Sequence, residues 1–194
     1  MDDDGYDDIV VGALSSGAGP YGNLYSIYVY SGASGILMAN IPSPQGWGLG
    51  FSMGQGNSTI AVGDANGDGF ADVAAVDRTV APGGVVYCFA QTGPTILWQR
   101  QGSSGGPMSD SSIQFIEDRN GDGGQELLIS THGQTGSWTN HTSWVELVDG
   151  ATGGTMLTIS EADPNVDYGF GAASLADSPG DGIREIGVIA VDST

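Results

Sequence analysis

The chain has 194 residues and carries 23 acidic residues against four arginines and no lysine, for a formal net charge of −19. A charge of this sign and size repels nucleic acid and anionic lipid, which excludes both as natural partners. It also destabilises a compact chain by self-repulsion unless cations neutralise it, so we expect bound cations.

Glycine accounts for 34 residues and separates short runs of Val, Ile, Leu and Tyr. This pattern is typical of all-β proteins with many tight turns. Apolar residues do not recur at helical period over any ten residues, so the sequence predicts no helix. No apolar stretch approaches the roughly 20 residues that a membrane-spanning helix needs, so we expect no membrane insertion.

Four acidic segments recur along the chain at intervals of about sixty residues. Their centres are Asp4, Asp68, Asp122 and Asp181. A short apolar run follows each acidic segment, at 9–13, 73–76, 127–130 and 186–190. After a polar stretch come a second run (27–30, 85–89, 145–148), a turn containing glycine, and a third run (36–39, 96–98, 156–159). A fourth run, at 60–62 or 113–116, leads into the next acidic segment.

Four short antiparallel strands per repeat is the layout of a β-propeller blade. The sequence therefore predicts one all-β domain over 1–194, with about three blades plus one extra strand. The repeats are expected at 1–62, 63–116 and 117–175, with a partial repeat at 176–194. Closed propellers typically have four to eight blades, so we expect either a homo-oligomer or a chain that belongs to a larger propeller.

Each acidic segment fits the pattern D-x-[DN]-x-D-G-x-x-[DE]. Side-chain oxygens fall at positions 1, 3, 5 and 9, and position 7 offers its backbone carbonyl. An oxygen-only shell of six to eight ligands suits Ca²⁺, whereas Mg²⁺ rarely uses all-protein cages and zinc prefers His and Cys. The predicted ligands are Asp64, Asn66, Asp68, Phe70 and Asp72 in the second segment, and Asp118, Asn120, Asp122, Gly124 and Glu126 in the third.

The fourth and first segments are less complete. The fourth has Pro179 at position 3 and so lacks one side-chain ligand, and in the first segment position 1 would precede Met1. The predicted ligands are Asp177, Asp181, Ile183 and Glu185 in the fourth segment, and Asp2, Asp4, Tyr6 and Asp8 in the first.

Two other interpretations of these segments compete with a calcium site. An EF-hand needs a bidentate Glu at position 12 and flanking helices, but Ala75, Ile129 and Val188 stand at that position and strands follow. Asp and Gly could instead serve turn geometry alone. Recurrence at a fixed period, always before a strand, favours calcium over this second interpretation.

At these residues the sequence resembles the FG-GAP repeats that form the blades of the integrin α-subunit propeller and of many secreted bacterial proteins. The resemblance covers nearly the whole chain. The name-giving dipeptide stands at Phe170-Gly171 and more loosely around 47–51, and Gly12-Ala13-Leu14 is the nearest form of the second element. The resemblance implies a secreted or cell-surface protein, typically a seven-bladed propeller, in which calcium stiffens the blade loops and ligands bind elsewhere.

The expected function is that of a non-catalytic, calcium-binding extracellular module for adhesion or for recognition of a protein or glycan. No nucleophile elbow, phosphate-binding loop or dinucleotide fingerprint is present in the sequence. His132 and His141 lie with Trp138 in a polar segment, where solvated side chains are favoured over a catalytic pair. One alternative is the propeller scaffold of a secreted carbohydrate-active enzyme such as a polysaccharide lyase. Another is a purely structural array of blades.

Overall fold

The computed structural model describes residues 4–15, 24–45, 48–50, 59–80, 83–91, 93–102, 112–131, 144–160 and 166–192. Within these residues the chain is all-β: thirteen strands form four antiparallel sheets, which confirms the predicted fold class. The same ranges contain no helix with the length and apolar character needed to cross a membrane.

The strands of each sheet lie side by side in chain order, and we number the sheets 1 to 4 along the chain. Sheet 1 comprises β1 (Ile9–Ser15), β2 (Leu24–Tyr30) and β3 (Leu37–Pro42). Sheet 2 comprises β4 (Ile60–Gly63), β5 (Asp72–Asp77), β6 (Val85–Phe89) and β7 (Ile96–Gln101). Sheet 3 comprises β8 (Ser112–Phe115), β9 (Leu127–Thr131), β10 (Trp144–Val148) and β11 (Thr155–Ser160). Sheet 4 comprises β12 (Val166–Ser174) and β13 (Ile186–Asp192).

The sheets are offset by one strand from the repeats in the sequence. In the sequence, the runs at 60–62 and 113–116 close one repeat. In the structure they are β4 and β8, which pair with β5 and β9 and so open sheets 2 and 3. Strands joined by a tight loop pair with each other readily, because closing a short loop costs less entropy than closing a long one. The second, third and fourth acidic segments are therefore hairpin connections within a sheet, whereas the first leads into β1. The strands group as three, four, four and two.

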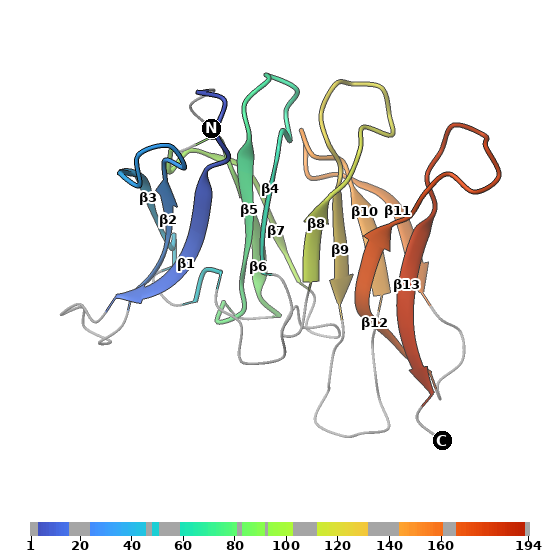
Figure 1. Cartoon of the computed structure of the whole chain (residues 1–194). Helices are drawn as coiled ribbons and strands as arrows, with labels where there is room; N and C mark the ends of the chain where they lie inside the picture. The colour runs from blue at the N-terminus through green and yellow to red at the C-terminus, as the bar shows by residue number, and fades with distance from the viewer. Residues whose placement is uncertain are drawn as a thin grey trace.

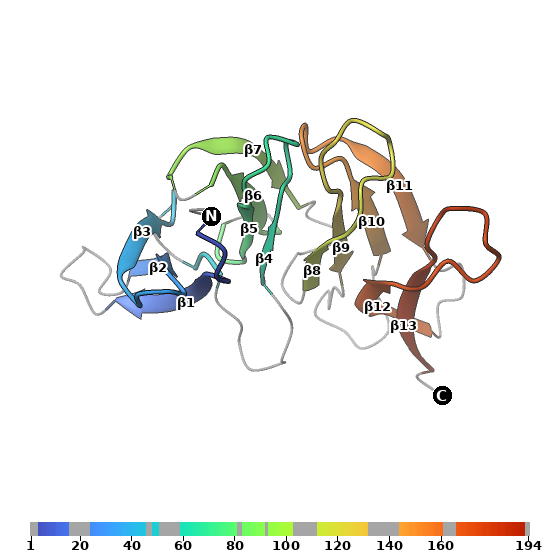
Figure 2. The same ribbon diagram turned by 45° about the horizontal axis from the view of Figure 1, so that its top comes forward.

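The four sheets follow one another in chain order, from sheet 1 to sheet 4 (Figure 1). The first strand of sheet 2, β4, contacts β8, and β8 contacts β12. These first strands lie along the inner side of an arc, while β3, β7 and β11 lie along its outer side (Figure 2). Such an arrangement, with the first strand of each sheet innermost, is that of successive propeller blades.

The core consists of three junctions between successive sheets. All six residues of β5 are buried, and their side chains alternate between the two faces of sheet 2. Val73 and Ala75 pack towards sheet 1, whereas Ala74 and Val76 pack towards sheet 3. Sheet 3 meets sheet 4 through a third cluster that includes Leu128. Each Val, Ile or Leu side chain buried in these junctions contributes about 1.5–3 kcal/mol.

Polar contacts join β7, the outermost strand of sheet 2, to sheet 3. Trp98 on β7 donates its Nε1–H to the Gly150 carbonyl oxygen, at 2.6 Å. Arg100, also on β7, forms an ion pair with Glu146 on β10, at 2.7 Å. Gly150 itself leaves no space for a larger residue, because an added Cβ would collide with the carbonyl oxygens of Gln125 and Ala65. The second and third acidic segments and the β10–β11 turn are therefore in contact with one another.

Candidate metal centre: the acidic loops

The acidic segments lie at one end of the array, at the top of Figure 1. We name them loops 1 to 4 after the sheets to which they belong. Loops 2, 3 and 4 are residues 64–72, 118–126 and 177–185 and connect the first two strands of their sheets. Loop 1 is described from Asp4 to Asp8 and leads into β1, while Asp2 lies outside the described residues. The sheets thus bring the predicted ligand sets into a row along one edge.

The first carboxylate of each complete loop is the centre of its turn. Asp64 Oδ1 accepts the backbone N–H groups of Gly67 and Asp68, at 2.8 and 3.1 Å. Its Oδ2 accepts the N–H of Gly69 at 2.9 Å. The equivalent carboxylates repeat the bonds to the glycines at positions 4 and 6: Asp118 with Gly121 and Gly123, and Asp177 with Gly180 and Gly182.

Positions 4 and 6 both require glycine. Gly67 and Gly69 have φ of 73° and 88°, a region that residues with a Cβ rarely adopt. The glycines at positions 4 and 6 of loops 3 and 4 have positive φ as well. The pattern D-x-[DN]-x-D-G-x-x-[DE] contains glycine at position 6 alone. Glycine also recurs at position 4 in the second, third and fourth segments, and this recurrence is the sequence signal for the second left-handed residue.

The side chains at position 5 face solvent. Asp68 Oδ1 accepts the N–H of Phe70 at 2.9 Å, and this bond holds the pKa of the Asp68 carboxyl below its ordinary value. In loop 3, N–H bonds from Gly121 and Gly123 lower the pKa of Asp118 at position 1 in the same way. Both loops therefore present anionic oxygen at the exposed edge.

The carboxylates at position 9 of loops 2 and 3 are buried at the base of the loops, where they hold the chain together. Asp72 is 0 % exposed and accepts the N–H groups of Ala65 and Gln91, at 3.0 and 2.8 Å. Glu126 is 1 % exposed and accepts the N–H groups of Arg119 and Asn120. Burial raises the pKa of both carboxyls. The bond to Gln91 ties loop 2 to the β6–β7 turn, a structural role that the sequence pattern does not reveal.

Loops 1 and 4 share parts of this arrangement. Asp181 accepts the N–H of Ile183, and Glu185 accepts the N–H of Ser178, as positions 5 and 9 do in loop 2. In loop 1, Asp4 accepts the N–H of Tyr6 at 2.9 Å, and Asp8 accepts the N–H of Gly32 at 3.1 Å. Loop 4 therefore keeps the turn of the complete loops although Pro179 replaces the position-3 ligand.

The ligand set is oxygen-only, as calcium requires, but its carboxylates do not converge on a common point. Within the described residues, no three His, Cys, Asp or Glu side chains are grouped closely enough to hold a metal ion. Each carboxylate accepts backbone N–H groups instead. A carboxylate oxygen has two lone-pair sites, and Asp64 Oδ2 accepts one described hydrogen bond. The position-1 carboxylate can therefore ligate a cation without losing the hydrogen bonds of its turn.

Some residues weighed in the sequence are not placed by the structure. His132, Trp138 and His141 lie outside the described residues, as do Trp47 and Phe51. Trp144 is described, and it begins β10 opposite Thr131 and Ser160 as a half-buried strand residue.

Comparisons with known proteins give a distant likeness in structure. The chain matches no protein-family model and no curated protein. Among solved structures it is similar to the Bacillus licheniformis rhamnogalacturonan lyase PL11, with 15% sequence identity and a TM-score of 0.43. The similarity covers 91% of this chain and 50% of the lyase, so the chain spans half the length of that protein. A likeness at this level does not bear on activity or on the resemblance to FG-GAP repeats.

The buried carboxylate at position 9 generates a stability prediction. Asp72→Asn should lower the free energy of unfolding by about 1–3 kcal/mol, because an amide can accept only one of the two N–H bonds that Asp72 accepts. Asp68→Asn is the matched control, because it is the same change in the same loop and Asp68 is exposed. The N–H of Phe70 bonds to Asp68 Oδ1, and an asparagine oxygen can accept the same bond. Urea unfolding in excess chelator measures both variants without any contribution from metal. Equal stability of the two variants would refute the structural role of position 9.

Proposed function

We propose that the chain is a non-catalytic, calcium-binding propeller-type module that recognises an extracellular protein or glycan. One observation supports the proposal most strongly. Loops 2, 3 and 4 have the same sequence pattern, and their first carboxylates bond to the glycines at positions 4 and 6 in the same way. Each of these loops also carries acidic residues at the exposed position 5 and at position 9, so the same set of carboxylates recurs three times.

Calcium would reduce the repulsion between the carboxylates of the acidic loops. Each complete loop carries three carboxylates, and the formal net charge is −19. A divalent ion held by positions 1, 3, 5 and 9 and the position-7 carbonyl supplies two positive charges where like charges are crowded. The position-9 carboxylates of loops 2, 3 and 4 lie at the start of the second strand of their sheets, so a bound ion would stiffen the loop against the sheet core.

The positive side chains give little support to the alternative of a carbohydrate-active enzyme. The chain has four arginines, and two of them are held in ion pairs between or near sheets. Arg100 pairs with Glu146 at 2.7 Å, and Arg119 pairs with Glu117 at 2.9 Å. Arg184 donates its Nε–H to the Leu175 carbonyl oxygen. These three side chains stabilise the fold, which leaves few cations to bind and polarise an anionic polysaccharide.

Calcium stoichiometry tests the metal part of the proposal. Wild-type protein should bind calcium at loops 2 and 3, and Asp68→Ala should remove one ion and weaken the fold more than Asp181→Ala. The reason is that loop 4 already lacks the position-3 ligand at Pro179. Native mass spectrometry counts the ions, and Asp7→Ala is the control because position 8 is not a ligand position. A wild-type count of zero, or a count that Asp68→Ala leaves unchanged, would contradict the proposal.

Binding without turnover tests the recognition part. The protein, loaded with calcium, should bind members of a glycan or extracellular-protein array, and binding should fall in chelator because the loops lose their stiffening ion. Chain cleavage is measured in parallel on a panel of acidic polysaccharides. Shortening of any of these polysaccharides by the wild-type protein would support the enzymatic alternative instead, and an array without hits would support a purely structural array of blades.

A further inference from the structure

Sheet 1 exposes residues whose equivalents in sheet 2 are completely buried. Val73 and Ala75, the first and third residues after loop 2, are 0 % exposed and pack against sheet 1. The first and third residues after loop 1 are Ile9 and Val11, and they are 55% and 41% exposed. Val10, between them, packs towards sheet 2. Ile9 and Val11 therefore lie on the face of sheet 1 that points away from the rest of the described chain.

Two tyrosines extend this outward face. Tyr30 pairs with Ile9 and Tyr28 with Val11, and directly opposed residues share a face of an antiparallel sheet. Their equivalents in sheet 2 are Phe89 and Tyr87, which are 1% exposed and stack with ring centroids 5.8 Å apart. We call the set Ile9, Val11, Tyr28 and Tyr30 face A.

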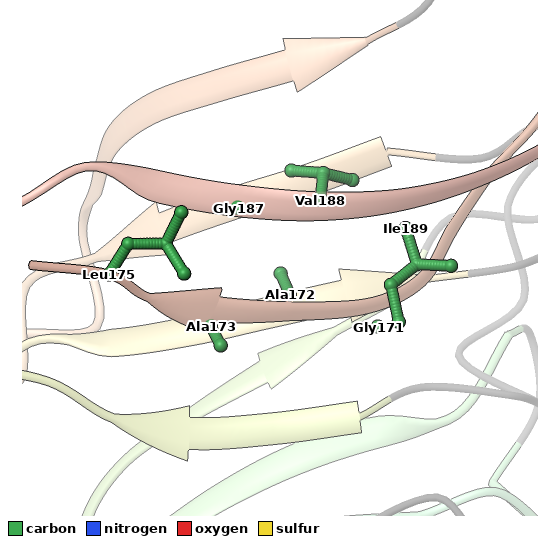
Figure 3. Close-up of a pocket in the computed structure, with 7 residues that line it drawn as sticks. All are labelled: Gly171, Ala172, Ala173, Leu175, Gly187, Val188 and Ile189. Atoms are coloured by element: carbon green, nitrogen blue, oxygen red, sulfur yellow. The ribbon is translucent and has the colours of Figure 1, made fainter.

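Sheet 4, at the other end of the array, also has an exposed apolar face. On β13, Ile186 and Val188 pack towards sheet 3, so Gly187 and Ile189 point away from it. The outward residues form an apolar depression of about 320 Å³, with Leu175 and Ile189 at its sides (Figure 3). Ile189 is 58% exposed and Leu175 is 49% exposed. We call the outward set face B, which consists of Gly171, Ala173, Leu175, Gly187 and Ile189.

Face B corresponds to faces that the chain itself covers in its interior. The second and fourth residues after loop 2 are Ala74 and Val76, which are 0 % exposed beneath sheet 3. The second residue after loop 3 is Leu128, which is 1% exposed beneath sheet 4. At the same positions after loop 4 stand Gly187 and Ile189. In each junction within the chain, the residues that correspond to face B in one sheet are covered by the residues that correspond to face A in the following sheet.

We propose that a second copy of this chain docks its face A onto face B, head to tail. The occupant is a second copy because the chain carries both halves of a junction that it already forms three times within itself. The contact is heterologous, since it joins two different surfaces, and it can close into a ring or continue to further copies. This inference is independent of calcium binding, because neither face includes a predicted ligand.

The net charge of the chain determines how this association depends on salt concentration. Each copy carries a formal net charge of −19, so two copies repel each other at low ionic strength. The Debye length falls from about 10 Å at 0.1 M salt to about 3 Å at 1 M salt, which removes most of this repulsion. An apolar contact between faces A and B therefore strengthens as salt rises, whereas a contact built on ion pairs would weaken.

Complementation between two blocked variants provides the test. Val11→Glu places a charge on face A, and Ile189→Glu places one on face B. Both residues are exposed within the single chain, so both variants should fold, and their circular dichroism spectra and thermal melts verify this. Ile96→Glu is the matched control, because Ile96 is 39% exposed on β7 of an interior sheet and belongs to neither face. Sedimentation velocity over a range of protein concentrations at low and high salt measures the assembly.

The wild-type chain and the Ile96→Glu variant should associate with rising concentration, and more strongly at high salt. Each blocked variant alone should sediment as a monomer, because head-to-tail contact needs both faces. An equimolar mixture of Val11→Glu and Ile189→Glu should form a one-to-one dimer through the two intact faces. A wild-type monomer at every concentration would overturn the proposal. Self-association of either blocked variant, failure of the mixture to pair, or loss of association in the control would overturn it as well.

Discussion

The first carboxylate of each acidic loop determines where the next strand begins. In loops 2, 3 and 4 its two oxygens accept backbone N–H groups from positions 4 and 6, where glycines adopt positive φ. The closed turn brings position 9 to the start of the second strand. Side chains alternate from that point, so the turn decides which residues face the preceding sheet and which face the following one. Both the acidic edge and the apolar junctions depend on this turn.

The loops and the core are physically coupled at position 9. Asp72 and Glu126 are buried carboxylates at the ends of loops, and the residues that follow them enter the junctions between sheets. Gln125, beside Glu126, donates its backbone N–H to the Asp64 carbonyl oxygen of the neighbouring loop, at 2.7 Å. Loops 2 and 3 are therefore in contact both with their own sheets and with each other. This coupling is the reason that an ion bound at the edge would stabilise the whole array.

The all-β class and the recurring unit could be predicted from the sequence because both are local patterns. Short apolar runs, glycine-containing turns and the acidic segments are each encoded within ten residues, and the structure contains the strands they predict. The grouping of strands into sheets is not local. The run at 60–62 stands between an acidic loop and a long preceding segment, and only the pairing of Ile60 with Ala75 assigns it to sheet 2. The bond from Gln91 to Asp72 is likewise a tertiary contact without a sequence signal.

The central claim is that the acidic loops bind calcium, and a thermal melt tests it most directly. The full chain is melted in excess chelator, in calcium and in magnesium, all at constant ionic strength so that screening of the net charge is the same. A ligand present at about 100 times its Kd stabilises the folded chain by roughly 2.7 kcal/mol per site. The account predicts a large rise in the melting midpoint with calcium and a smaller rise with magnesium. A midpoint that is the same in chelator and in calcium would contradict it.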